Sequence, residues 1–202
     1  MLVYVRHGKT SHNLGGSEEK LRGWLPLPLT DEGRRQANLT GQHLKGINRP
    51  LTFSSSDLPR AMESAKIIGK HIGMDPTPDP AIRDWNTGRL AGKKFEAVKH
   101  IIFDLIDHPD KPAPGGESLN SYLARFVPAM RKRAMDTSTH LVVGHARGAT
   151  ILQGIASDKG GRGGEIDPKF LKQRPDVGPS EILINPADWY QRIVRDHLKG
   201  SK

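Results

Sequence analysis

The sequence predicts an α/β domain of three layers, in which a mostly parallel sheet is covered by helices on both faces. Leu2–Val5 and Leu141–Gly144 are short apolar runs without polar alternation, which is typical of strands buried on both faces. Segments with helical periodicity separate these runs, and strands that alternate with helices usually form parallel sheets. The length of 202 residues suits one compact unit, so a single domain over 1–202 is expected.

The other elements follow from apolar spacing and from boundary residues. Further strands are expected at Leu51–Ser54 and Glu181–Ile184. The predicted helices cover residues 30–46, 58–73, 95–106 and 119–135, with a last helix after Gly148. Thr30 is a capping residue, and Pro128 is expected to kink or divide its helix. Residues 160–179 are rich in glycine, proline and charge and are expected to form a long surface loop.

The composition narrows the chemistry. The chain has no cysteine, which excludes disulfides, thiolate catalysis and thiolate zinc sites, so a nucleophile must be His, Ser, Thr, Lys or a carboxylate. No apolar stretch is long enough to span a membrane, and charged Arg6 ends the first apolar run too early for a signal peptide. We therefore expect a cytoplasmic protein without a membrane partner.

The charge balance favours anionic ligands. The chain has 31 basic and 22 acidic side chains, a formal net charge of +9. The basic residues are dispersed, and an aromatic content of 5% offers few surfaces on which bases could stack, so a nucleic-acid partner is not expected. A small phosphorylated substrate is the expected partner. The sequence gives no indication of the oligomeric state.

Two histidines each follow directly on a predicted buried strand. His7 comes after the first run and its arginine, and His145 comes after Leu141–Gly144. Ligands gather at the carboxyl ends of parallel strands, so both imidazoles are expected at one edge of the sheet, provided that the two strands are neighbours. Gly8, Gly144 and Gly148 beside them are expected to let an anion approach the main chain. The pattern predicts an anion site built around two histidines.

The residue types at this site point to phosphoryl transfer. Imidazole can attack phosphorus directly when cations neutralise the phosphoryl oxygens, so His7 is the candidate nucleophile. Arg6 and Arg60 are the candidate cations, because a planar guanidinium binds phosphate through paired hydrogen bonds. Two simpler interpretations stay open: a buried His7 that is merely satisfied by hydrogen bonds, and an ion pair between Arg60 and Glu63.

A proton donor is also needed, because the ester oxygen leaves as an alkoxide. Asp84 is the candidate for this role, with the capping of a turn as the alternative. Glu117 is expected to stabilise a helix N-terminus rather than to act in catalysis.

At these positions the sequence resembles the histidine phosphatase superfamily, which includes the cofactor-dependent phosphoglycerate mutases. The matching blocks stand in the family's order and cover roughly residues 2–150. They are Arg6-His7-Gly8-Lys9-Thr10 with Asn13, Pro28-Leu29-Thr30 with Gly33 and Gln36, Ser55-Ser56-Asp57-Leu58 with Arg60-Ala61, Pro114-Gly115-Gly116-Glu117-Ser118 and Val143-Gly144-His145.

The resemblance implies a phosphoglycerate mutase-like fold and a role for each matching residue. It implies that His7 is phosphorylated, that Arg6, Arg60 and His145 form the phosphate pocket, and that Asn13 also contacts phosphate. Asp84 stands where the family usually has a glutamate as proton donor. The family's mutases carry a long insertion after this acid, whereas only residues 88–114 intervene here, which favours a phosphatase.

We therefore expect a phosphomonoesterase that acts through a phosphohistidine on His7 and needs no metal or cofactor. Two alternatives stay open, a cofactor-dependent phosphoglycerate mutase and a phosphate-recognising regulatory module without turnover. Substrate specificity is expected to come from residues 88–114 and from the loop after Gly160.

Overall fold

The computed structural model describes residues 1–45, 52–156, 168–172, 178–179, 182–185 and 191–193. Within these residues one sheet has six strands in the order β3-β2-β4-β1-β5-β6. The strands are β1 (Leu2–Arg6), β2 (Thr52–Ser55), β3 (Thr77–Pro78), β4 (His140–Gly144), β5 (Ile182–Asn185) and β6 (Gln191–Ile193). Gly46, Leu51, Glu181 and the glycine cluster at 160–164 lie outside the described residues.

The sheet is mostly parallel, as the apolar runs predict. β1, β2, β3 and β4 are joined by parallel pairings, whereas β5 runs antiparallel to β1 and β6 antiparallel to β5. The short strands β3 and β6 were not predicted. Neither is an apolar run: β3 is exposed, and its two residues are threonine and proline.

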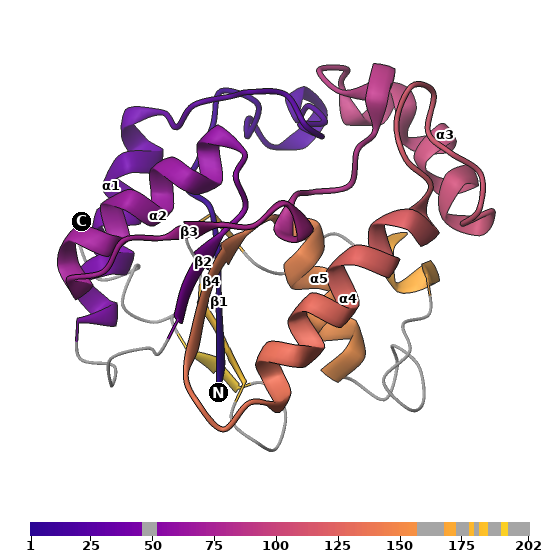
Figure 1. Ribbon diagram of the computed structural model, residues 1–202. Helices are drawn as coiled ribbons and strands as arrows, with labels where there is room; N and C mark the ends of the chain where they lie inside the picture. The colour runs from indigo at the N-terminus through magenta and orange to yellow at the C-terminus, as the bar shows by residue number, and fades with distance from the viewer. Residues whose placement is uncertain (46–51, 157–167, 173–177, 180–181, 186–190, 194–202) are drawn as a thin grey trace.

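Helices lie on both faces of this sheet, which completes the three layers. α1 (Asp31–Leu44) and α2 (Pro59–Ile72) cover one face, and α4 (Leu119–Met135) and α5 (Ala146–Ala156) cover the other (Figure 1). α3 (Phe95–Asp107) lies on the same side as α4 and α5 and farther from the sheet. Short 3-10 helices are η1 (Gly16–Glu18), η2 (Pro80–Ile82), η3 (Gly88–Leu90) and η4 (Pro168–Lys172). None of the described helices is long and apolar enough to cross a membrane.

Alternate residues of β1 enter different cores, because successive side chains of a strand point to opposite faces. Leu2 and Tyr4 belong to the core under α3, α4 and α5, whereas Val3 and Val5 belong to the core under α1 and α2. All five residues of β1 are buried. Because both faces of β1 are buried, successive residues from Leu2 to Val5 need to be apolar, and polar residues do not alternate with them.

Three helix predictions need correction. Pro128 does not divide its helix: α4 is one helix through this residue, because Phe126 and Met130 are buried in the core and their packing offsets the lost backbone hydrogen bond. α5 begins before Gly148, at Ala146. Within the predicted loop 160–179, η4 forms because Leu171 is 5% exposed and anchors it in the core.

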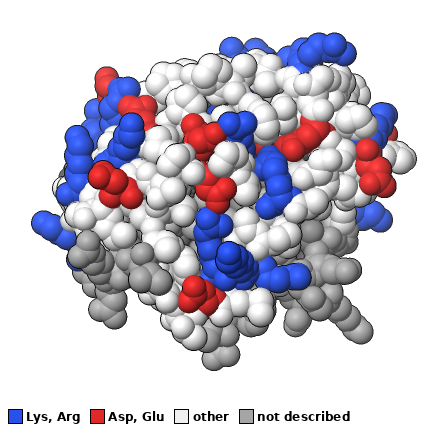
Figure 2. Space-filling model, in the orientation of Figure 1, with Lys and Arg blue, Asp and Glu red and all other residues white. Residues whose placement is uncertain are grey.

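Basic and acidic side chains are mixed on the surface. On the face shown in Figure 2, Lys and Arg side chains lie among Asp and Glu side chains over the helices. Several of them form exposed ion pairs, such as Arg34–Asp31 and Arg35–Glu32. Exposed pairs of this kind contribute about 0–1 kcal/mol each, so they affect solubility more than stability.

Candidate active site

The two strand ends that carry histidines lie side by side. β1 and β4 pair in parallel with Arg6 opposite Gly144, and the His7 amide donates to the Gly144 carbonyl at 2.9 Å. The His7 and His145 rings are 5.2 Å apart between centroids, at an interplanar angle of 64°. Both side chains are buried. The expected juxtaposition of the two imidazoles is therefore present.

Tyr4 fixes the turn that presents His145. Its hydroxyl accepts from the His145 amide at 2.8 Å and donates to the His145 carbonyl at 3.0 Å. A Cβ atom on Gly144 or Gly148 would collide with this hydroxyl, and one on Gly8 would collide with the Gly33 carbonyl. These glycines were expected to admit an anion; the structure shows instead that they are needed for close packing behind the site.

The hydrogen bonds of His7 define its tautomer. Nδ1 lies 2.7 Å from the Gly8 carbonyl oxygen and must donate, and Nε2 accepts from Arg60 Nε at 3.2 Å. Burial lowers the pKa of His7 well below 6.5, and the positive charges of Arg60 and Arg6 lower it further. The imidazole is therefore neutral at neutral pH, and its unprotonated atom is Nε2.

Arg60 is held by the loop before α1. It is fully buried, and its Nη1 and Nη2 donate to the carbonyls of Leu25 at 3.1 Å and Gly23 at 2.8 Å. Burial lowers the pKa of Arg60 to about 10, so the guanidinium stays charged at neutral pH. The alternative of an ion pair with Glu63 is wrong, because Glu63 pairs with Arg34 at 2.7 Å.

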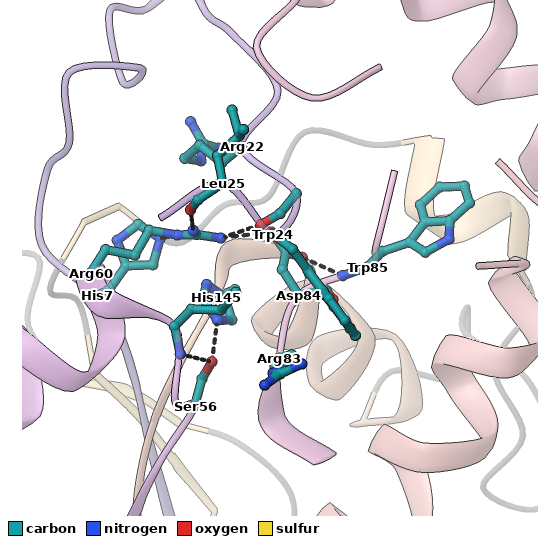
Figure 3. Close-up of polar contacts among 12 residues, drawn as sticks. His7, Arg22, Trp24, Leu25, Ser56, Arg60, Arg83, Asp84, Trp85 and His145 are labelled. Atoms are coloured by element: carbon teal, nitrogen blue, oxygen red, sulfur yellow. Dashed lines mark hydrogen bonds and ion pairs between the residues drawn. The ribbon is translucent and has the colours of Figure 1, made fainter. Parts of the chain in front are cut away.

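His145 offers a buried N–H group. Ser56 Oγ lies 2.8 Å from His145 Nε2 and already accepts from the Leu58 amide at 3.3 Å (Figure 3). When the imidazole proton is on Nδ1, Nε2 accepts the hydrogen of this hydroxyl. Nδ1 is buried without a hydrogen-bond partner in the described structure. Burial and then the charge of Arg60 lower the pKa of His145 well below 6.5.

Asp84 faces the same site from a loop. Its Oδ2 lies 3.7 Å from Arg60 Nη2, and its Oδ1 accepts from the Trp85 amide at 3.0 Å. Arg60 is therefore shared between His7 and Asp84, as Figure 3 shows. The bond to the Trp85 amide is the local backbone contact that the turn-capping alternative predicts, so Asp84 combines this contact with a position at the site.

Side chains from other segments of the chain hold the Asp84 loop. Arg125 of α4 donates to the carbonyls of Ala81, Arg83 and Asp84 at 3.1, 2.8 and 2.8 Å. Trp24 Nε1 donates to the same Asp84 carbonyl at 2.7 Å. The position of the carboxyl group therefore depends on residues far from it in sequence.

Glu117 belongs to this support and not to a helix cap. Its Oε1 accepts from the Asn86 amide at 2.8 Å and from Arg125 Nη2 at 2.6 Å. Its carbonyl accepts from Trp85 Nε1 at 3.0 Å. The cap of α4 is Ser118, whose side chain accepts from the Ser121 amide. Glu117 thus precedes the helix N-terminus as expected, but its carboxylate binds the Asn86 amide and Arg125 instead of the first amides of the helix.

Asn13 is positioned by a tight turn. Its Oδ1 accepts from the amide and the hydroxyl of Thr10 at 3.0 and 2.9 Å. Because the oxygen is committed, the group that Asn13 can offer to a phosphate is its Nδ2 amide. Its side chain is buried, which suits a ligand held below the surface.

A cavity of about 530 Å³ opens beside these groups, lined among others by Arg6, Arg22 and Asp84. Arg22 was missed by the sequence reasoning, since no motif marks it. It pairs with Glu19 at 2.6 Å, and its charge contributes to the lowered pKa of both His7 and His145. In the described part of the chain, no cluster of His, Asp and Glu side chains could hold a metal ion.

Comparisons with known proteins agree with this geometry. The family model of the histidine phosphatase superfamily (branch 1) matches residues 2–158. The phosphoglycerate mutase-like protein 4 of Arabidopsis thaliana is 32% identical over 138 residues, which are 65% of this chain and 59% of that protein. The match thus spans less than two thirds of the plant protein.

Two further comparisons name a mutase and a phosphatase. A 2,3-bisphosphoglycerate-dependent phosphoglycerate mutase of Methylobacterium sp. (strain 4-46) is 31% identical over 176 residues, 78% of this chain and 83% of that protein. The structure of mycobacterial glucosyl-3-phosphoglycerate phosphatase superposes with a TM-score of 0.68 over 96% of each chain. Its identity of 22% shows a shared fold only.

Proposed function

Since the chain belongs to the histidine phosphatase superfamily, we propose that it is a phosphomonoesterase that acts through a phosphohistidine on His7. One observation carries this proposal: the His7 ring donates through Nδ1 to the Gly8 carbonyl and leaves Nε2 beside Arg60. A neutral imidazole with its lone pair next to a guanidinium is equipped to attack a phosphate monoester.

In the first step His7 Nε2 attacks phosphorus, and the bond between phosphorus and the ester oxygen breaks. Arg6, Arg60 and His145 Nδ1–H stabilise the equatorial oxygens, while Asp84 gives its proton to the leaving alkoxide. Asn13 contributes its amide to the same oxygens. The products of this step are the free alcohol and the phosphoenzyme.

In the second step water attacks the phosphohistidine and the bond between phosphorus and nitrogen breaks. Asp84, now a carboxylate, accepts the proton of this water and returns to its initial state. Nε2 regains its lone pair, and inorganic phosphate leaves. The sum of both steps is hydrolysis of the ester.

The direct test is hydrolysis of p-nitrophenyl phosphate in the presence of EDTA. We expect nitrophenol release together with a phosphoenzyme that is labile in acid and stable in alkali, as a phosphoramidate is. His7→Asn should abolish both signals. Hydrolysis by this variant at the wild-type rate would refute the proposal, and the matched variant His43→Asn, on the exposed side of α1, should keep both signals.

The Methylobacterium relative makes a phosphoglycerate mutase the second candidate. Residues 88–114 contain α3 and no long insertion, which supports the phosphatase. The two are distinguished with 3-phosphoglycerate: a mutase forms the 2-isomer faster than phosphate and is stimulated by 2,3-bisphosphoglycerate. A regulatory module without turnover would bind vanadate but give no phosphoenzyme.

A further inference from the structure

The cavity that Asp84 lines has an unusual wall for an enzyme of small polar phosphates. Much of its lining is apolar and comes mainly from α3 and η4. The apolar lining residues are Leu21, Trp85, Phe95, Ile102, Phe103 and Leu171. A polar alcohol such as a sugar would leave this surface without a matching partner, whereas an apolar body gains about 25 cal/mol per Å² of apolar surface removed from water.

Three of the cations that line the cavity are paired with acidic neighbours. The pairs are Lys172–Asp107 at 2.6 Å, Lys99–Glu96 at 3.7 Å and Arg22–Glu19 at 2.6 Å. The ammonium groups of Lys172 and Lys99 also lie 5.5 and 5.8 Å from the centroid of the Phe103 ring. These side chains therefore form part of the cavity wall, and their charges are balanced by residues of the protein.

Arg147 differs from them. Within the described residues no carboxylate pairs with its guanidinium, whose Cζ lies 5.0 Å from the centroid of the Trp85 ring. Stacking on an indole fixes the plane of a guanidinium and leaves its N–H edge for an oxyanion. Arg147 is also in the first turn of α5, where the helix dipole favours negative charge.

We infer that the alcohol of the substrate carries an apolar body, of the size of a fused aromatic pair, and a carboxylate or similar oxyanion. The body packs against Ile102, Phe103 and Leu171, and the oxyanion binds Arg147. A cavity of about 530 Å³ accommodates such a group. The inference rests on the proposed function, because the phosphate must lie at His7 while the alcohol occupies the cavity.

Four primary alkyl phosphates test this inference with leaving groups of equal intrinsic reactivity. They are ethyl phosphate, 2-naphthylethyl phosphate, its carboxylate derivative and the neutral carboxamide analogue of that derivative. We expect kcat/KM to rise about tenfold or more from ethyl to naphthylethyl, and about tenfold from carboxamide to carboxylate. Equal values within both pairs would overturn the inference.

Matched variants assign each preference to its residue. Arg147→Met should reduce the ratio of carboxylate to carboxamide to about one, whereas Arg35→Met, which removes an exposed arginine of α1, should preserve it. Phe103→Ala should reduce the ratio of naphthylethyl to ethyl. Each ratio is taken within one variant, so a change in the folded fraction cancels. An unchanged ratio in Arg147→Met would contradict the role of this residue.

Binding can be measured without turnover. The Kd of each of the four esters is determined by calorimetry with the His7→Asn variant. If no ester is hydrolysed by the wild type but the Kd values follow the expected order, the proposed function fails and the cavity assignment stands. If esters are hydrolysed without these preferences, the proposed function stands and the cavity assignment fails. Equal Kd values for all four esters would overturn the assignment in either case.

Discussion

The nucleophile side and the acid side of the site are built in different ways. His7 and His145 extend two neighbouring parallel strands, so the main-chain ladder between β1 and β4 places them. Asp84 lies in a loop whose carbonyls are held by Arg125 and Trp24. The difference teaches that one half of the chemistry depends on regular backbone pairing, and the other half on single side-chain contacts.

The largest expected effect is a loss of activity that depends on the leaving group for the acid side of the site but not for the nucleophile side. His7→Asn should lower kcat/KM at least about 10⁴-fold for every ester, because it removes the attacking atom. Asp84→Asn should lower it strongly for ethyl phosphate but little for p-nitrophenyl phosphate, whose leaving group needs no proton. Steady-state kinetics with both esters measures this. Equal losses in Asp84→Asn with the two esters would contradict its role as proton donor.

The support of the acid loop should come next in size. Arg125→Met removes one of the two side-chain donors to the Asp84 carbonyl, all the Arg125 bonds to the Ala81 and Arg83 carbonyls, and the cation paired with Glu117. We therefore expect kcat for ethyl phosphate to fall about 100-fold. The loss should be small for p-nitrophenyl phosphate and should not add to that of Asp84→Asn. Lys132→Met, on the exposed side of the same helix, is the control. Full additivity with Asp84→Asn would show that Arg125 acts elsewhere.

Ser56 should have a smaller effect on the strand side. Ser56→Ala removes the hydroxyl from His145 Nε2, so the ring proton is no longer directed to Nδ1. We expect about a tenfold loss of kcat/KM with either ester, and weaker inhibition by vanadate. Ser56→Thr, which keeps a hydroxyl, should recover part of the activity. An unaltered vanadate affinity in Ser56→Ala would argue against this hydrogen bond as the positioning contact.

The last prediction concerns the dependence of the free energy of unfolding on pH. The pKa values of His7 and His145 are lowered by burial and by nearby arginines, so the unfolded chain binds protons near pH 6.5 that the folded chain excludes. The free energy of unfolding is therefore highest above pH 6.5 as far as these two histidines are concerned, and it falls as the pH drops below 6.5. We measure the free energy of unfolding by urea titration at several pH values between 5 and 7. This free energy should change less with pH in His145→Asn than in the wild type, and as much as in the wild type in His43→Asn.

The same difference explains how much the sequence could predict. Buried strands leave a continuous apolar run, so the ends that carry His7 and His145 could be found from residues 2–5 and 141–144. The contacts of Arg125 and Trp24 with the Asp84 loop have no local signal, since their partners are main-chain carbonyls 41 and 60 residues away. Arg22 was missed for another reason: its ion-pair partner Glu19 is only three residues away, but no motif marks this arginine.

The position of Ser56 at the site could have been predicted from the strand pattern. It follows β2 directly, and its amide donates to the Val143 carbonyl at 2.9 Å, in line with the parallel register. A polar residue after a third strand end would have been expected at the same edge of the sheet. η4 could not be found in this way, because one anchoring leucine in a segment rich in glycine and proline gives no periodicity.

The antiparallel strand β5 has a consequence for the nucleophile. β1 lies inside the sheet, with β4 on one side and β5 on the other, so its amides are closed off along both edges. Hydrogen exchange of such amides requires opening of the sheet itself, whereas loops exchange through local fluctuations. We therefore expect local fluctuations to reach the loop that carries Asp84 before they reach the strand that ends at His7.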